Sequence, residues 1–453
     1  LRLTAGAPVP IPAPAGIQAE PPPEGHWNMN YAALAMHRRR NWLATVCGHS
    51  RYLRRGLSCN NGNLFGRYIT FGQLEILPQS DELKCFRHDG WDWNRWPGIT
   101  APVKPLKLLS EEVRNLDENS GFEEMLLSTE AFAGGINLNH RNGIFGMILH
   151  GHPKYEKNFR ARKSWFFLDN LIVCLGSGIY SEDTQNPVHT TLFQTPLAEN
   201  DNGPFSAPDL CGYNFNAARI DSCGTPSTWI SDSVGNSYYL PTGEFSITFG
   251  EQVSPAQHDG SYTAGRFACA WLDHGIAPEH GDYAYAVLPQ CKDETPEFVA
   301  AMKGDTPPYV ILRRDDNAHI VRYPGDNLTG YVMFRSGSVD VPGPVVAVDT
   351  PCLVMAQTIG RTLKLSVGNP DLRLYEGDDK DQYDADGNQV EVSLYSRLWA
   401  ANSSRPAPLR LRLLRRWELR AGNGCHLVES NDHETILEFI CHDGLTFQAE
   451  LTR

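Results

Sequence analysis

Short runs of apolar residues, separated by turn-forming residues, follow one another along most of the chain and predict strands. The runs are four to seven residues long and are either continuous or alternate with polar positions, which is the length and period of β-strands. Glycine, asparagine, aspartate and proline interrupt them at regular intervals, as they do between neighbouring strands. In the first three quarters of the chain the predicted strands are residues 42–46, 67–71, 143–149, 164–167, 170–175, 245–249 and 309–312.

Helical patterns are much rarer. Residues 110–127 are predicted to be helical in part, and residues 294–302 are predicted to form a helix with Pro296 in its first turn. A chain with many short strands and no long helices between them is expected to form antiparallel sheets that stack as sandwiches. The predicted fold class is therefore all-β.

Proline clusters divide the chain into three predicted regions. Residues 1–24 contain two proline-rich runs, which favour extended polyproline conformation, and are predicted to be a linker. A second cluster, at residues 336–351, separates a large sandwich over residues 25–341 from a small one over residues 345–453. A module of about a hundred residues with roughly seven strands is typical of a small sandwich. Its predicted strands include residues 352–355, 362–366, 390–394, 409–414 and 434–440.

The chain is acidic overall, with a net charge of −13, which argues against general nucleic-acid binding. No apolar run is long enough to span a membrane, so neither nucleic acid nor membrane is expected as a partner. However, residues 25–74 contain no aspartate or glutamate and seven arginines. Such a stretch is suited to a groove for a polyanion, because carboxylates would repel that ligand; the alternative is a solvated strand edge. The arginines are Arg38, Arg39, Arg40, Arg51, Arg54, Arg55 and Arg67.

Metal and disulfide chemistry is only weakly indicated. The eleven cysteines include no Cys-x-x-Cys pair, so a zinc site is not expected, and both disulfides and single buried thiols remain open. His150 and His152 have no third ligand in view. The acidic loop from Asp378 to Asp386 has residues that bind Ca²⁺, but Ser393 stands where a full calcium loop has glutamate. A solvated hairpin tip is the alternative, and no other cofactor is expected.

Several motifs follow one another in a characteristic order: residues 60–68, 91–98, 161–169, 175–179, 190–194, 271–274, 283–285 and 369–372. In order and spacing they resemble polysaccharide lyase family 8, the chondroitin and hyaluronan lyases, and most closely its chondroitin ABC lyase branch. The resemblance implies a large antiparallel super-sandwich followed by a small C-terminal β-sandwich. It also implies an acidic polysaccharide as substrate, and with it an extracellular, secreted or periplasmic location.

The family's reaction is β-elimination, in which a base removes the C5 proton of a uronic acid and the C4–O bond breaks. The resemblance implies that a tyrosine and a histidine of a helical domain act as acid and base, with an arginine nearby. The sheet region supplies a glutamate and, three residues later, an asparagine that helps to neutralise the substrate carboxylate. The asparagine position falls on Asn60, and a second asparagine of the same loop is Asn63. The glutamate position falls on Leu57, which cannot accept a hydrogen bond.

Two functions follow from this comparison. The chain is either the β-sheet portion of a lyase that needs a separate or missing helical domain, and is then inactive alone, or a catalytically degenerate carbohydrate-binding or structural protein. Leu57 favours the second function. In either case we expect a set of polar residues to bind acidic polysaccharide, although Asn-Asn-Gly-Asn is also ordinary turn sequence. The predicted binding residues are Asn60, Asn63, Arg51, Arg54, Arg55 and Arg67.

Overall fold

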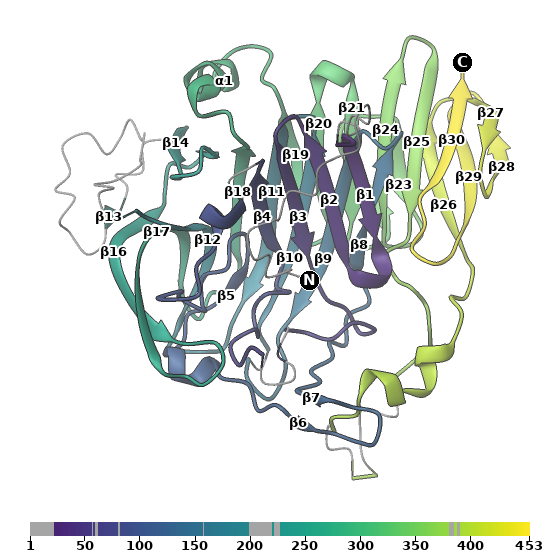
Figure 1. Ribbon diagram of the computed structural model, residues 1–453. Coiled ribbons are helices and arrows are strands. Elements are labelled where there is room, and N and C mark those ends of the chain that lie inside the picture. Colours follow the sequence, from purple (N-terminus) through teal and green to yellow (C-terminus); the bar gives the residue numbers. More distant parts are fainter. Residues whose placement is uncertain are drawn as a thin grey trace, which may run out of the picture.

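The computed structural model describes residues 22–56, 58, 62–79, 82–156, 158–198, 220–221, 227–379, 385–386 and 390–453. Nearly all of these residues belong to antiparallel sheets and their connections (Figure 1), which confirms the all-β class. Among the residues described there is one α-helix, α1 (Thr295–Met302), where a helix was predicted. The predicted linker, residues 1–24, lies outside the described residues as far as residue 21.

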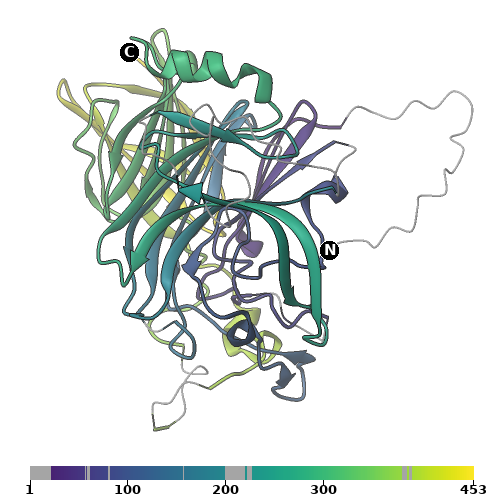
Figure 2. The same ribbon diagram turned by 90° about the vertical axis from the view of Figure 1, so that its left-hand side faces the viewer.

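Two sheets form the first layer of the molecule. The four-stranded sheet contains β1 (Gly25–Met29), β2 (Leu34–Arg39), β3 (Trp42–Cys47) and β4 (Gln73–Pro78), in that order. The five-stranded sheet contains, in spatial order, β13 (Ile220–Asp221), β16 (Ser246–Pro255), β17 (Tyr262–Ile276), β12 (Pro187–Pro196) and β5 (Thr100–Pro102). Strands β16 and β17 make a long hairpin that curves to the lower end of the molecule (Figure 2).

A seven-stranded sheet forms the second layer. In spatial order its strands are β14 (Thr228–Ser231), β15 (Ser237–Leu240), β18 (Gly281–Leu288), β11 (Leu171–Tyr180), β10 (Arg160–Leu168), β9 (Asn142–His150) and β8 (Ala133–Leu138). Strand β10 shows that this sheet is buried on both faces. Trp165 and Phe167 belong to the core shared with β3, whereas Phe166 and Leu168 belong to the core shared with the third layer. Side chains alternate along a strand, so a continuous apolar run requires a core on each face.

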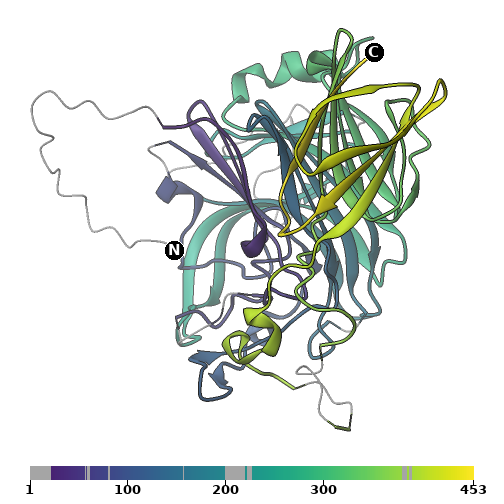
Figure 3. The ribbon, with the colours of Figure 1, turned by 90° about the vertical axis from the view of Figure 1, so that its right-hand side faces the viewer.

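The remaining strands form the third and fourth layers. The third is a seven-stranded sheet of β19 (Val310–Arg314), β20 (Ala318–Tyr323), β21 (Leu328–Met333), β24 (Cys352–Ile359), β25 (Thr362–Gly368), β30 (Phe447–Thr452) and β27 (Glu418–Gly422). The fourth contains β22 (Gly337–Ser338), β23 (Val345–Val348), β26 (Ala407–Leu414), β29 (Glu434–Cys441) and β28 (Cys425–Ser430). Val354 and Leu411 both belong to the hydrophobic core between them. Figures 2 and 3 show the sequence of layers from purple through blue to green and yellow.

The third layer crosses the predicted domain boundary. Strand β21 precedes residues 341–345 and β24 follows them, yet the two strands pair from Leu328↔Gln357 to Met333↔Cys352. A boundary at residues 341–345 would therefore divide strands that share one sheet. The extents of the large and small sandwiches stay a prediction.

Three local predictions were wrong. Residues 110–127 form no helix; instead the short strands β6 (Arg114–Asn115) and β7 (Phe122–Glu123) flank a turn. There the Ser120 hydroxyl accepts hydrogen bonds from the backbone N–H groups of Leu116 and Asp117, and such side-chain bonds compete with helix formation. Residues 67–71 and 390–394 are not strands: the first run forms turns, and in the second Ser393 N–H binds the Asp117 carboxylate.

Eight cysteines lie in the described part of the chain, and none of these eight is in a disulfide. Burial raises the pKa of the Cys174 and Cys269 thiols to about 12, so both stay protonated at neutral pH. No helix within the described ranges has the length and apolar character needed to cross a membrane.

Candidate functional site

The predicted site lies on the loop that joins β3 to β4. The loop starts after Cys47 with a β-bridge between Ser50 and Leu53 and ends before Gln73 in consecutive turns. Backbone bonds attach it to neighbouring segments: Arg51 N–H donates to Glu130 O and Arg55 N–H to Leu126 O, both at 2.8 Å. These bonds fix the loop on the N-terminal side of its central part.

Two residues that defined the sequence prediction fall in that central part. Leu57 and Asn60 lie outside the described residues. The role of Asn60 in binding a substrate carboxylate, and the effect of Leu57 at the family's glutamate position, stay predictions. Asn63 is described and half-buried, and its side-chain oxygen accepts a hydrogen bond from Phe65 N–H at 2.9 Å. This is the bond of an Asx turn, so Asn63 shapes the loop.

The loop beyond Asn63 rests on the tip of the β16–β17 hairpin. Leu64 N–H donates to Gln257 O at 2.7 Å, and Phe65 stacks on Trp93 with ring centroids 5.7 Å apart. The indole N–H of Trp93 donates to Pro255 O at 2.7 Å. The hairpin tip thus forms one wall of the candidate site.

Arg55 and Arg67 are buried behind the loop. Nη2 of Arg55 donates to Oε2 of Glu156 at 2.9 Å, and Nη1 of Arg67 lies 3.8 Å from Oε1 of the same carboxylate. The exposed fractions of the three side chains are 0%, 1% and 0%. Neither guanidinium is accessible to a polysaccharide in this conformation. Their burial argues that they hold the loop in place and do not contact a ligand directly.

Aromatic rings complete this buried network. The Arg67 guanidinium lies 3.4 Å from the centroid of the Tyr155 ring, and that of Arg55 lies 4.6 Å from the Phe71 centroid. Arg67 also donates to two backbone carbonyls, Leu108 O at 3.0 Å and Ser110 O at 3.1 Å. Such planar, many-donor contacts are what arginine provides and lysine does not.

Carboxylates surround the loop even though its own sequence has none. Glu124 accepts hydrogen bonds from Lys154 Nζ and from the Tyr155 hydroxyl, both at 2.5 Å. Glu111 is buried beside Gly56, and burial together with the charge of Glu124 raises its pKa to about 8, so it is protonated at neutral pH. The acid-free window of the sequence therefore does not produce an acid-free site, because residues 123–156 supply the carboxylates.

Arg54 and Arg51 are the predicted arginines that keep some exposure. Nη1 of Arg54 donates to Oε2 of Glu123 at 3.1 Å, and 21% of the Arg54 side chain is exposed. Arg51 lies 4.0 Å from the centroid of the Tyr375 ring and donates to Gly377 O. Of the predicted arginines on this loop, these two are placed best for contact with a ligand.

Sequence reasoning missed a segment that supports the loop, residues 369–379 and 390–402, which comes after β25 of the third layer. The Tyr52 hydroxyl donates to Asp371 Oδ1 at 2.7 Å, and its ring packs edge-on against Trp399. Asp379 accepts from Trp399 Nε1 at 2.7 Å and from Arg397 at 3.2 Å. The motif at residues 369–372 was the signal in the sequence, but its contact with Tyr52 spans more than 300 residues. We call this segment the brace.

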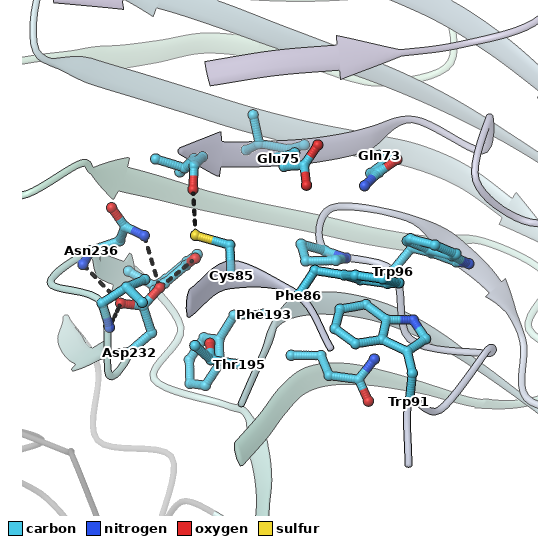
Figure 4. Close-up of a pocket in the computed structure, with 16 residues that line it drawn as sticks. Gln73, Glu75, Cys85, Phe86, Trp91, Trp96, Phe193, Thr195, Asp232 and Asn236 are labelled. Carbon is cyan, nitrogen blue, oxygen red and sulfur yellow. Dashed lines mark hydrogen bonds between the residues drawn. The ribbon is translucent and has the colours of Figure 1, made fainter. Parts of the chain in front are cut away.

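The motif at residues 91–98 is part of the core. Trp91, Trp93 and Trp96 are at most 4% exposed, and Asp92 fixes the turn by accepting from Arg95 Nε at 3.1 Å. Figure 4 shows Trp91 and Trp96 around Phe86 beside a hollow whose far wall contains Asp232 and Asn236. The hollow has about 30 Å³ of free space, which is enough for one water molecule but not for a sugar ring.

No group of three or more metal-ligating side chains suited to an ion occurs within the described ranges. Burial lowers the pKa of His152 to about 3. In the predicted calcium loop, the Asp379 carboxylate accepts hydrogen bonds from Arg397 and Trp399, whereas Asp381 and Asp384 lie outside the described residues. Calcium binding stays a prediction.

Family comparisons agree with this architecture. The chain matches two models of polysaccharide lyase family 8, the super-sandwich domain over residues 24–297 and the C-terminal beta-sandwich domain over residues 310–373. The chain therefore belongs to polysaccharide lyase family 8.

Particular relatives are glycosaminoglycan lyases. The chondroitin sulfate ABC exolyase of Bacteroides thetaiotaomicron is 39% identical over 97% of this chain and 42% of the relative. The exolyase of the same name from Proteus vulgaris is 37% identical over 89% of this chain and 40% of the relative. The chain thus spans about two fifths of the length of these relatives.

Solved structures show the same fold. The chondroitin AC lyase of Streptomyces coelicolor A3, in complex with chondroitin sulphate, aligns with a TM-score of 0.72 at 21% identity, over 97% of this chain and 51% of that chain. The xanthan lyase of Paenibacillus aligns with a TM-score of 0.73 at 18% identity, over 97% of this chain and 38% of that chain. At these identities the likeness concerns the fold alone.

Proposed function

We propose that this chain is the β-sheet portion of a lyase that cleaves uronic-acid-containing glycosaminoglycans by β-elimination, together with a helical domain. The observation that carries the proposal is the 39% identity to the Bacteroides thetaiotaomicron chondroitin sulfate ABC exolyase across 97% of this chain. The fixed loop between β3 and β4, with Arg51 and Arg54 at its accessible side, supports it. Because such polymers are extracellular, a secreted or periplasmic location is part of the proposal.

The proposed division of labour follows from the chemistry near the loop. The amide of Asn60 can donate a hydrogen bond to a substrate carboxylate, but an amide cannot take up a proton at neutral pH. Tyr52 and Tyr68 are the tyrosines of this loop. Burial and the charge of Asp371 raise the pKa of Tyr52, and burial and the charge of Glu156 raise the pKa of Tyr68. Neither phenol is suited to be the base, so the helical domain is proposed to supply it.

Leu57 supports a second candidate function, a catalytically degenerate protein that binds acidic polysaccharide. A leucine cannot orient neighbouring groups as the family's glutamate does. The two candidates differ in what a helical domain adds: it should bring turnover to a lyase and only affinity to a binding protein.

The experiment measures the ultraviolet absorbance of the unsaturated product with chondroitin, dermatan and hyaluronan. We expect no turnover by the 453-residue chain or by Leu57→Glu alone, because a general base typically contributes about 10²- to 10⁴-fold. Addition of a family helical domain should produce turnover, and this turnover should be lower when the chain carries Asn60→Ala. Asn63→Ala is the matched control, which shows how much activity is lost when only the shape of the loop is disturbed. Clear turnover by the chain alone would show that the base has been placed wrongly.

A further inference from the structure

An exposed aromatic cleft lies at the lower end of the molecule. Tyr395 is 77% exposed and Phe122 is 50% exposed, and both line a cleft of about 190 Å³ together with Arg54 and Glu123. Figure 3 shows the two segments, η8 (Leu394–Ser396) in yellow-green and the β6–β7 hairpin in blue, at this end. Single exposed apolar residues are ordinary, but those gathered at one cleft mark a binding surface.

The turn that carries Tyr395 is fixed by hydrogen bonds. The Asp117 carboxylate accepts from Ser393 N–H at 2.9 Å, and the Ser393 hydroxyl accepts from Tyr395 N–H at 3.4 Å. The Asn119 amide donates to the Ser396 hydroxyl at 3.1 Å. The hairpin and the turn are thus bound to each other across more than 270 residues of sequence.

Burial on the other side of the turn strengthens this support. Arg397 is 3% exposed and donates to Asp379, which also accepts from the indole of Trp399. The fold therefore orders the main chain around Tyr395 while leaving its ring in water. Ordering a binding group beforehand lowers the entropy cost of binding, which is the advantage that such a scaffold gives a ligand site.

The chemistry of the cleft indicates the ligand. An aromatic face attracts the apolar C–H face of a pyranose ring, as it attracts other apolar surfaces. Arg54 donates one N–H to Glu123. A guanidinium has five N–H donors, so the remaining N–H groups of Arg54 can bind a sulfate or carboxylate. The Arg54–Glu123 pair is neutral overall and does not repel a polyanion. One sugar unit with an anionic substituent can contact the aromatic rings with its C–H face and the Arg54 guanidinium with its anionic group.

We propose that Tyr395, Phe122 and Arg54 form an outer subsite for one unit of an acidic polysaccharide, beside the loop that carries Asn60. The subsite is continuous with the candidate site, because Arg54 precedes Arg55, whose buried ion pair anchors that loop. The assignment rests on the proposed function, since it extends the same binding surface toward the brace. Longer chains should extend past Arg54 to Tyr395 and Phe122, whereas short chains bound at the loop should not reach these two rings.

The experiment is isothermal titration of the 453-residue chain with a chondroitin sulfate tetrasaccharide and a dodecasaccharide. Tyr395→Ala should weaken binding of the dodecasaccharide about 3- to 10-fold, the range expected for one aromatic contact, and leave the affinity for the tetrasaccharide unchanged. Tyr395→Phe keeps the ring and should bind as the wild type does. Leu427→Ala is the matched control, because Leu427 is 42% exposed on β28.

The outcomes separate the subsite from the proposed function. Unchanged binding of both oligosaccharides by Tyr395→Ala would overturn the subsite alone, and an equal loss for both lengths would place Tyr395 in the central site. Absence of binding by the wild type would overturn the proposed function and the subsite with it. A changed oligomeric state of sugar-free Tyr395→Ala would identify the cleft as a contact between copies of the chain.

Discussion

Arg55 and Arg54 are neighbours in the sequence, but substitutions of the two should have different effects. Substitution of Arg55 should lower the stability of the fold, and substitution of Arg54 should weaken binding of chondroitin sulfate. In Arg55→Met the buried carboxylate of Glu156 loses its partner at 2.9 Å and keeps the more distant Arg67 at 3.8 Å. Removal of one member of a buried ion pair typically costs about 3–5 kcal/mol. Methionine fills much of the vacated volume, so most of this loss should come from the uncompensated charge and not from a cavity.

Arg54→Ala is the matched substitution, because it also removes one arginine from the same loop. Its pair with Glu123 is partly exposed, so the cost should be about 1 kcal/mol, while binding of chondroitin sulfate should weaken. Urea unfolding followed by tryptophan fluorescence measures the free energies, and titration calorimetry measures the binding.

The double substitution Arg55→Met, Glu156→Gln tests the origin of the loss, because it removes both charges. It should recover part of the stability that Arg55→Met loses, as residues in one ion pair do not act additively. The reasoning would be refuted if Arg55→Met unfolded like the wild type yet lost its affinity for chondroitin sulfate. Arg55 would then be a ligand contact and not a buried support.

Two further predictions concern pH and the brace. Burial lowers the pKa of His26 and His319 to about 3. As the pH falls below the unfolded value of about 6.5, these histidines become protonated in the unfolded chain but stay neutral in the folded one. The free energy of unfolding should therefore fall by about 1.4 kcal/mol per pH unit for each histidine. His319→Gln should flatten this dependence in urea unfolding measured from pH 7 to pH 5; an unchanged slope would contradict it. Tyr52→Phe leaves the Asp371 carboxylate without its 2.7 Å hydrogen bond, and we expect a loss of about 1–3 kcal/mol with faster hydrogen exchange in residues 50–55. Exchange at the wild-type rate would mean that the brace does not hold the loop.

The layered all-β fold could be predicted from the sequence, because strand length and period are local properties. The continuous run Ser164–Phe167 of β10 is a case in point: only a sheet buried on both faces accommodates it. For residues 110–127 the apolar pattern led to a wrong helix prediction. The side-chain hydrogen bonds of Ser120 determine the turn there, and the spacing of apolar residues does not reveal such bonds.

The electrostatics of the site could not be predicted from the same pattern. The window without carboxylates indicated a free basic groove, but Arg55 meets Glu156 from 101 residues further along the chain. The contact between Tyr52 and Asp371 is more distant still. Burial of a charge depends on such tertiary partners, and no local property of an arginine-rich segment reveals them.

The most direct test of the proposed function is an elimination assay on the 453-residue chain mixed with a helical domain from a family 8 lyase. Absorbance of the unsaturated product from chondroitin sulfate is followed for the chain, the helical domain and the mixture. The proposal predicts product from the mixture only, and less of it when the chain carries Asn60→Ala. Product from the chain alone, or a mixture of properly associated parts that forms none, would contradict it.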